Sequence, residues 1–124
     1  MNPQFLLAVA AGGAIGSVAR YLVGIGSGKL FGMNFPWGTL IINVTGSFLI
    51  GALVGLFAIK WDFSHTARLF LTVGICGGYT TFSSFSLQTL ALARDGEWLF
   101  ATLNAIGSFV LCLFAVWLGD HLAV

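Results

Sequence analysis

Residues 71–90 read LTVGICGGYTTFSSFSLQTL, and this stretch has the length of a membrane span together with features that interrupt a helix. It lies in an uncharged run, 69–93, of 25 residues, whereas a helix crosses the hydrocarbon core with about 20 apolar residues. The pair Gly77-Gly78 precedes five hydroxyl side chains within seven residues, and both features weaken an α-helix. The stretch therefore predicts a membrane-spanning helix that breaks near its centre.

The rest of the chain is equally poor in charge. Three more runs lack Lys, Arg, Asp and Glu: 1–19, 30–59 and 98–119. Of 124 residues, 7% are charged and 58% are hydrophobic, whereas a soluble domain carries roughly a quarter charged residues. Such a composition excludes disorder, and a net charge of +1 offers no basic face for nucleic acid. We therefore expect an all-α integral membrane protein in which 1–124 form a single domain of four transmembrane helices.

Span limits follow from hydropathy and turn residues. The expected spans are Phe5–Ile25, Gly38–Ile59, Ala67–Leu92 and Trp98–Gly119. Turn chemistry separates them in 26–32, 60–62 and 94–97. The tryptophans lie at span ends, where amphipathic rings favour the headgroup region: Trp37, Trp61, Trp98 and Trp117.

Basic residues are balanced between the two sides of the membrane. Lys60 and Arg68 fall on the side of the termini, and Lys29 and Arg94, with Arg20 as a possible third, fall on the other. Orientation is set by Lys/Arg asymmetry, so this balance favours insertion in both orientations. The alternative, that a small bias fixes one orientation, stays open. Four helices are too few to surround a water-filled pore, so transport would require an oligomer.

Small residues recur at four-residue spacing on two spans. Gly12 and Gly16 do so on the first span, and Ser47, Gly51 and Gly55 on the second. Such residues let helix backbones approach closely in lipid. The contacts they predict lie either within one subunit or between two.

Non-helical backbone survives at membrane depth only when it is buried in protein or lines a polar cavity, and interrupted helices recur at ion sites. Freed carbonyl groups suit an alkali cation. Phe82 and Phe85 lie three residues apart beside the break, and positive ring edges suit an anion. A kinked packing helix, with the two rings as ordinary packing, is the alternative.

Polar side chains on the other spans are compatible with an ion path. Asn43 lies inside the second span and is costly there unless its amide is satisfied. Asn104, Ser108 and Cys112 form a stripe on the fourth span, which is either a polar track or a helix contact. Arg20 can snorkel to the interface or supply a positive vestibule, and the two roles are compatible.

Groups for proton relay or catalysis are expected outside the spans. The carboxylates are Asp62, Asp95, Glu97 and Asp120, and the imidazoles are His65 and His121. No general base is thereby placed against the serines, and an enzyme is not expected. A proton-coupled exporter normally uses a carboxylate at membrane depth.

The decapeptide GGYTTFSSFS, residues 77–86, closely resembles the signature of the Fluc (CrcB) fluoride channels, usually GG-x-[ST]-TFS-[ST]-FS. The resemblance extends through GGAIGSVARYL at 12–22, PWGTLIINVTGS at 36–47 and the stripe on the fourth span. It implies a dual-topology homodimer of antiparallel subunits, with two fluoride pores lined by both chains and a structural Na+ at the interface.

The resemblance also implies roles by position. The backbone carbonyls of Gly77 and Thr80 would bind Na+, and Arg20 would be the vestibule charge. The pore would be lined by Asn43, Phe82, Phe85, Ser84, Ser108 and Cys112. Three positions depart from the family pattern, because Gln88 replaces a frequent Glu, Asn104 a Tyr found in some members, and Cys112 a hydroxyl residue.

These observations predict a passive fluoride channel of the cell membrane (the inner membrane in a two-membrane cell) that exports fluoride and relieves its toxicity. One rival is a small four-span drug or cation exporter that works as an antiparallel dimer. It would need a carboxylate within a span. A non-transporting membrane scaffold is a second rival, and it would not need the hydroxyl cluster.

Overall fold

The computed structural model describes residues 1–60 and 62–123, and these form helices without any strand. The expected all-α class is confirmed for this part of the chain. Trp61, one of the tryptophans expected at a span end, lies outside the described residues. The elements are α1 (Pro3–Phe31), α2 (Trp37–Ile59), α3 (His65–Leu69), the π-helix η1 (Phe70–Cys76), α4 (Gly77–Tyr79), α5 (Phe82–Arg94) and α6 (Trp98–Ala123).

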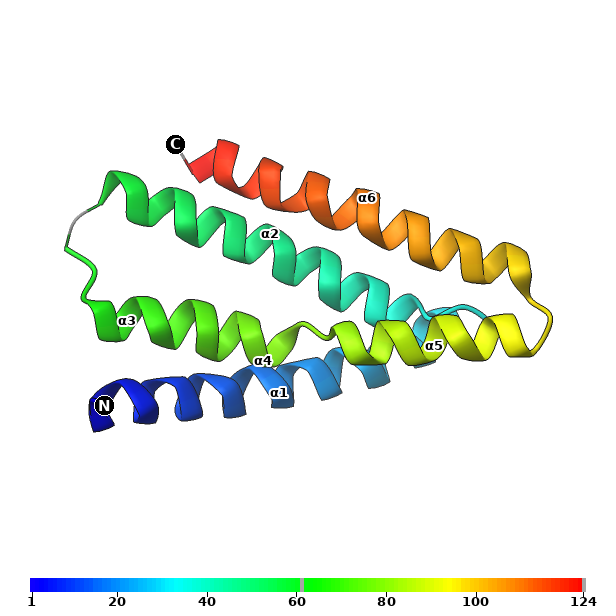
Figure 1. The fold of residues 1–124 in the computed structure, drawn as a ribbon, viewed down its shortest axis with the longest axis horizontal. Coiled ribbons are helices and arrows are strands. Elements are labelled where there is room, and N and C mark those ends of the chain that lie inside the picture. Colours follow the sequence, from blue (N-terminus) through cyan, green and yellow to red (C-terminus); the bar gives the residue numbers. More distant parts are fainter. Residues whose placement is uncertain (61, 124) are drawn as a thin grey trace.

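The helices α1 and α2, the segment 65–94 and the helix α6 run back and forth as roughly antiparallel passes (Figure 1). Within the described residues, α1, α2 and α6 are each long and apolar enough to cross a membrane. The remaining pass is assembled from α3, η1, α4 and α5, which follow one another along the bundle, and we call it the third pass. The start of α1, the end of α2, the start of α3 and the end of α6 lie at one end of the molecule, as the four-span prediction requires (Figure 1).

The predicted end of the first span is wrong. Residues 26–32 were expected to form a turn, but α1 continues to Phe31 and ends at Gly32, whose φ is 79° and whose N–H donates to the Gly28 carbonyl at 3.0 Å. The start of α2 packs on this extension: a Cβ added at Gly38 would lie 3.5 Å from the Cβ of the buried Ser27. Tertiary packing therefore overrides the weak helix propensity of the glycines.

The glycines of the small-residue stripes pack within one chain. A Cβ atom at Gly51 would overlap the Val116 carbonyl oxygen on α6, and one at Gly55 would lie 2.9 Å from the Asp120 carbonyl oxygen. On the other side of the bundle, a Cβ at Gly16 would overlap the Ile75 carbonyl oxygen of η1. The glycines thus let α6 pack closely on α2 and the third pass on α1. Of the two predicted kinds of contact, within one subunit or between two, these glycines make the first.

Candidate functional site

The third pass breaks near its middle, as predicted. The helix ends at Tyr79, and the next two residues are extended, with φ/ψ of −80°/156° at Thr80 and −149°/114° at Thr81. A new helix, α5, starts at Phe82, and the Thr81 hydroxyl caps it by accepting a hydrogen bond from the Ser84 N–H at 3.1 Å. The hydroxyl cluster thus starts a helix after the break, while Gly77 and Gly78 lie in the last turn before it.

Asn43 on α2 satisfies the backbone at the break. Its Nδ2 donates to the Thr81 carbonyl at 3.0 Å, and its Oδ1 accepts from the Thr81 N–H at 2.8 Å. In an uninterrupted helix that N–H would donate to the Gly77 carbonyl. The side-chain amide therefore replaces a turn of helix, and one of the two hydrogens on Nδ2 remains for another acceptor.

The break leaves backbone oxygen without an intrahelical donor. The N–H and the hydroxyl of Thr80 both donate to the Cys76 carbonyl, at 3.0 and 2.9 Å, but no donor among the described residues reaches the Thr80 carbonyl. Gly77 lies on the surface of the chain, where a Cβ would meet only the Thr72 carbonyl oxygen at 3.7 Å. Bare carbonyl groups and an uncovered glycine are thus close in sequence on the third pass.

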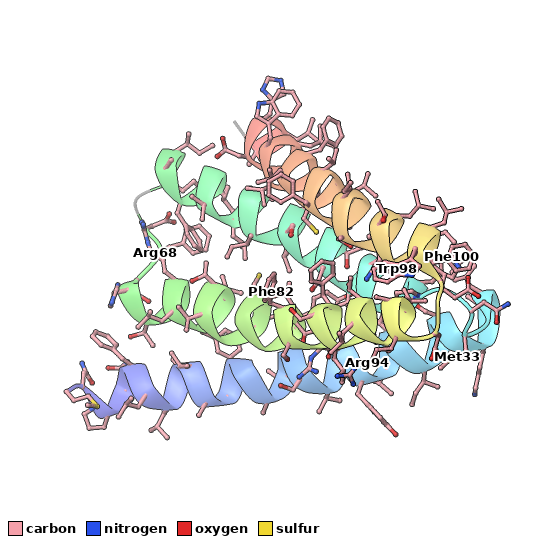
Figure 2. The ribbon with its side chains drawn as sticks, turned by 45° about the vertical axis from the view of Figure 1, so that its right-hand side comes forward. Met33, Arg68, Phe82, Arg94, Trp98 and Phe100 are labelled. Atoms are coloured by element: carbon pink, nitrogen blue, oxygen red, sulfur yellow. The ribbon has the colours of Figure 1, made fainter. Side chains whose placement is uncertain are left out.

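A large apolar groove of about 1090 Å³ opens beside this segment, between α2, the third pass and α6. Phe82, 78% exposed, lies near the middle of the third pass (Figure 2). Its ring centroid is 5.5 Å from that of Phe85. Most residues proposed from the sequence gather in this groove: Asn43, Gly77, Thr80, Phe82, Phe85, Ser108 and Cys112.

The polar stripe on α6 divides between two roles. Asn104 is 1% exposed, and its Nδ2 donates to the Thr89 hydroxyl on α5 at 2.8 Å. Its Oδ1 accepts from the Ser108 hydroxyl at 3.4 Å. Asn104 is therefore part of a helix contact, as one of the two readings had it, whereas Ser108 and Cys112 line the groove.

Ser84 and Arg20 line a second hollow, of about 530 Å³, together with Lys29 and Thr39. The structure therefore does not bring Ser84 into the groove that contains Ser108 and Cys112. Arg20 is half-buried, and its Nε–H donates to the Gly78 carbonyl at 3.1 Å.

Sequence reasoning missed several features around the break. Residues 70–76 form a π-helix, and the Gly77 N–H, which follows it, contacts the carbonyls of Thr72 and Gly74. The link from Arg20 to Gly78 was also missed, although the glycines of 12–16 and 74–78 signal a close approach of these helices.

Two other polar side chains lie in places that the sequence did not indicate. Gln88, one of the departures from the family pattern, has a buried Oε1 without a hydrogen-bond partner in the described residues. Asp120 lies in the last turns of α6 beside Gly55, not beyond the helix.

Comparison with known proteins gives a consistent result. A family model described as "CrcB-like protein, Camphor Resistance (CrcB)" matches residues 7–120. A Nitrobacter winogradskyi protein named "Fluoride-specific ion channel FluC" is 64% identical over 116 residues, which cover 94% of this chain and 92% of the relative. Proteins of the same name from Opitutus terrae and Paramagnetospirillum magneticum are 52% and 53% identical, over 95% and 93% of this chain and 91% of each relative.

Proposed function

Because the chain belongs to the CrcB family and is similar throughout to fluoride-specific ion channels, we propose that it conducts fluoride passively out of the cytoplasm through an antiparallel homodimer with two pores. Fluoride enters cells as neutral HF at acid pH and ionises inside, so an anion leak suffices to relieve its toxicity. The cell membrane, the inner one where there are two, is the proposed location. An ion channel is not an enzyme.

The observation that carries this proposal is the broken third pass opening onto the groove. Phe82 and Phe85 line this groove with aromatic rings, Asn43 has a remaining amide hydrogen, and Ser108 contributes a hydroxyl. These are weak, uncharged contacts for an anion, and conduction requires binding weak enough to permit exit. Ser84 and Arg20, in the second hollow, are proposed to lie on the approach to this path.

A second copy of the chain is the proposed cover of the groove. Its rim carries large apolar side chains that are strongly exposed in one chain, with Ile106 at 60%, Phe109 at 68% and Leu113 at 58%. Lipid could cover such residues, but lipid cannot satisfy the bare backbone at Thr80. The balanced loop charges allow a copy in the opposite orientation.

The carbonyls of Gly77 and Thr80 are proposed to hold a structural Na+ between the two subunits. The donor set fits such an ion. The N–H that would bond the Gly77 carbonyl is taken by Asn43, and the Thr80 carbonyl meets no donor in the described residues. Carbonyl oxygens are hard ligands that suit an alkali cation, and a symmetry-related copy would double their number. The ion would fix the two breaks against each other.

The residues that line the groove and the second hollow do not favour the rival prediction, a drug or cation exporter. Neither the groove nor the second hollow is lined, in the described residues, by an aspartate or glutamate. Among the described residues Asp120 is the carboxylate that lies within a candidate span, and it lies in the last turns of α6 rather than near the centre of that helix. Proton-coupled export normally relies on a carboxylate at membrane depth.

Fluoride flux from vesicles tests the proposal. Purified protein reconstituted in liposomes loaded with potassium fluoride should release fluoride rapidly once valinomycin balances the charge, as read by a fluoride-selective electrode. Little release is expected without valinomycin, because the flux is electrogenic. Vesicles loaded with chloride should release it much more slowly. Chloride release as fast as that of fluoride would contradict the proposal.

The two phenylalanines provide a more local test. Phe82→Ile and Phe85→Ile should each sharply lower fluoride flux, because isoleucine keeps apolar volume but lacks the positive ring edge. The dimer should survive, since both substitutions retain a large apolar side chain in the groove. Phe114→Ile, on the exposed face of α6, is the matched control and should leave flux unchanged. Normal flux in both groove variants would show that the rings only pack.

A further inference from the structure

Arg20 is bonded directly to the segment that precedes the break. Its Nε–H donates to the Gly78 carbonyl across 58 residues of sequence, at 3.1 Å. The two helices are in close contact here, because a Cβ added at Gly78 would lie 2.6 Å from the Gly13 carbonyl oxygen. The last turn of α4 is therefore held against α1 by packing and by a charged donor.

Arg20 and Asn43 bind the backbone on both sides of Thr80 in the sequence. Arg20, from α1, binds the carbonyl two residues before Thr80, and Asn43, from α2, binds both backbone groups of Thr81 just after it. Between these two points the Thr80 N–H still donates to the Cys76 carbonyl, as in a helix, but the Thr80 carbonyl accepts no hydrogen bond from the described residues. The carbonyl directions in this segment thus depend on two side chains from other helices.

We propose that Arg20 is a positioning residue for the carbonyls of Gly77 and Thr80, acting through its Nε–H on Gly78. This inference rests on the sodium site of the proposed function, and it differs from a role as a mobile vestibule charge. A vestibule charge requires only positive potential, which Lys29 also supplies in the same hollow without a hydrogen bond to the third pass in the described residues. A positioning role requires the donor at one atom.

Three substitutions separate the donor from the charge. Arg20→Gln places an amide nitrogen at the chain position of Nε, so it keeps the donor and removes the charge. Arg20→Lys keeps the charge, but it has a methylene where the Nε–H was. Arg20→Met lacks both. Lys29→Met removes a charge from the same hollow and is the matched control.

The test is a sodium titration of dimer assembly. Purified protein is incubated in lipid vesicles at increasing NaCl, with N-methylglucamine chloride holding ionic strength constant, and the dimer fraction is measured by photobleaching of singly labelled subunits. In Arg20→Met and Arg20→Lys the half-saturating Na+ concentration should rise roughly tenfold, the size expected for a lost hydrogen bond to a charged group. Arg20→Gln and Lys29→Met should stay close to the unsubstituted protein. If Arg20→Met assembles poorly, high NaCl should restore it.

Each other outcome overturns the inference. Unchanged sodium dependence in Arg20→Met, or poor assembly that high NaCl does not restore, would show that Arg20 does not position the site. Normal behaviour of Arg20→Lys with a shifted Arg20→Gln would show that the charge acts and not the Nε–H. A protein whose assembly ignored Na+ would remove the sodium site as well. Fluoride release from the same vesicles tests channel function separately from both.

Discussion

Replacing Asn43 with leucine is expected to abolish fluoride flux and to weaken folding. The substitution leaves the N–H and the carbonyl of Thr81 without their partners at membrane depth. An unpaired buried polar group costs about 1–3 kcal/mol, so the two together should remove several kcal/mol of stability. Flux from vesicles and the thermal stability of the purified protein measure the two effects.

Two further variants define the role of Asn43. Asn43→Asp keeps an acceptor for the Thr81 N–H but places a carboxylate in the groove, so it should fold better than Asn43→Leu and still conduct little fluoride. Thr45→Val, on the same helix, loses a hydroxyl that bonds its own turn and Tyr79 outside the groove, and it should conduct normally. Fluoride flux near the normal rate in Asn43→Leu would show that the break does not need this amide.

Replacing Gly77 with leucine should separate the dimer into monomers and stop fluoride flux, while each chain still folds. Within one chain a Cβ atom added here meets only the Thr72 carbonyl oxygen, at 3.7 Å, and the position borders the open groove, so we expect the fold to accept the leucine. A second copy of the chain, if it lay close enough to share an ion, would leave no room for this leucine. Subunit counting in vesicles, together with circular dichroism, distinguishes the two effects.

The matched control for this variant is Gly26→Leu. Gly26 lies in α1, where an added Cβ meets nothing within 4 Å, and it lines neither hollow. It should therefore keep both assembly and flux. A dimer that persisted in Gly77→Leu with normal sodium dependence would contradict the proposed interface.

The sequence was most informative where one residue type dominates a long stretch. The uncharged runs predicted the four passes, and the glycine pair with its hydroxyl neighbours predicted a break near the centre of the third span, because both signals are local. The structure places that break at 80–81. The extension of α1 through Gly26 and Gly28 was not predictable in this way. It depends on the start of α2, which packs against Ser27.

The positions of polar side chains around the break were harder to predict, for a geometric reason. A helix relates its residues by a fixed rotation, but two extended residues remove that relation between α4 and α5. Within α5, helical spacing does separate Ser84 from the face of Phe82 and Phe85, but spacing does not determine which of these faces meets the groove and which the other hollow. In the same way, the burial of Asn104 depends on its partner Thr89 on another helix. The sodium ion, the antiparallel dimer and the role of each pore residue stay predictions.

The interruption of the third pass has an electrostatic consequence. A continuous helix has one positive and one negative end, both near the membrane surfaces, and its dipole adds about half a unit charge at each. Splitting it at Thr80 and Thr81 brings a negative helix end, in α4, and a positive helix end, in α5, to the middle of the third pass, only two residues apart. Without any ionised side chain, one peptide segment can thus attract a cation on one side and an anion on the other.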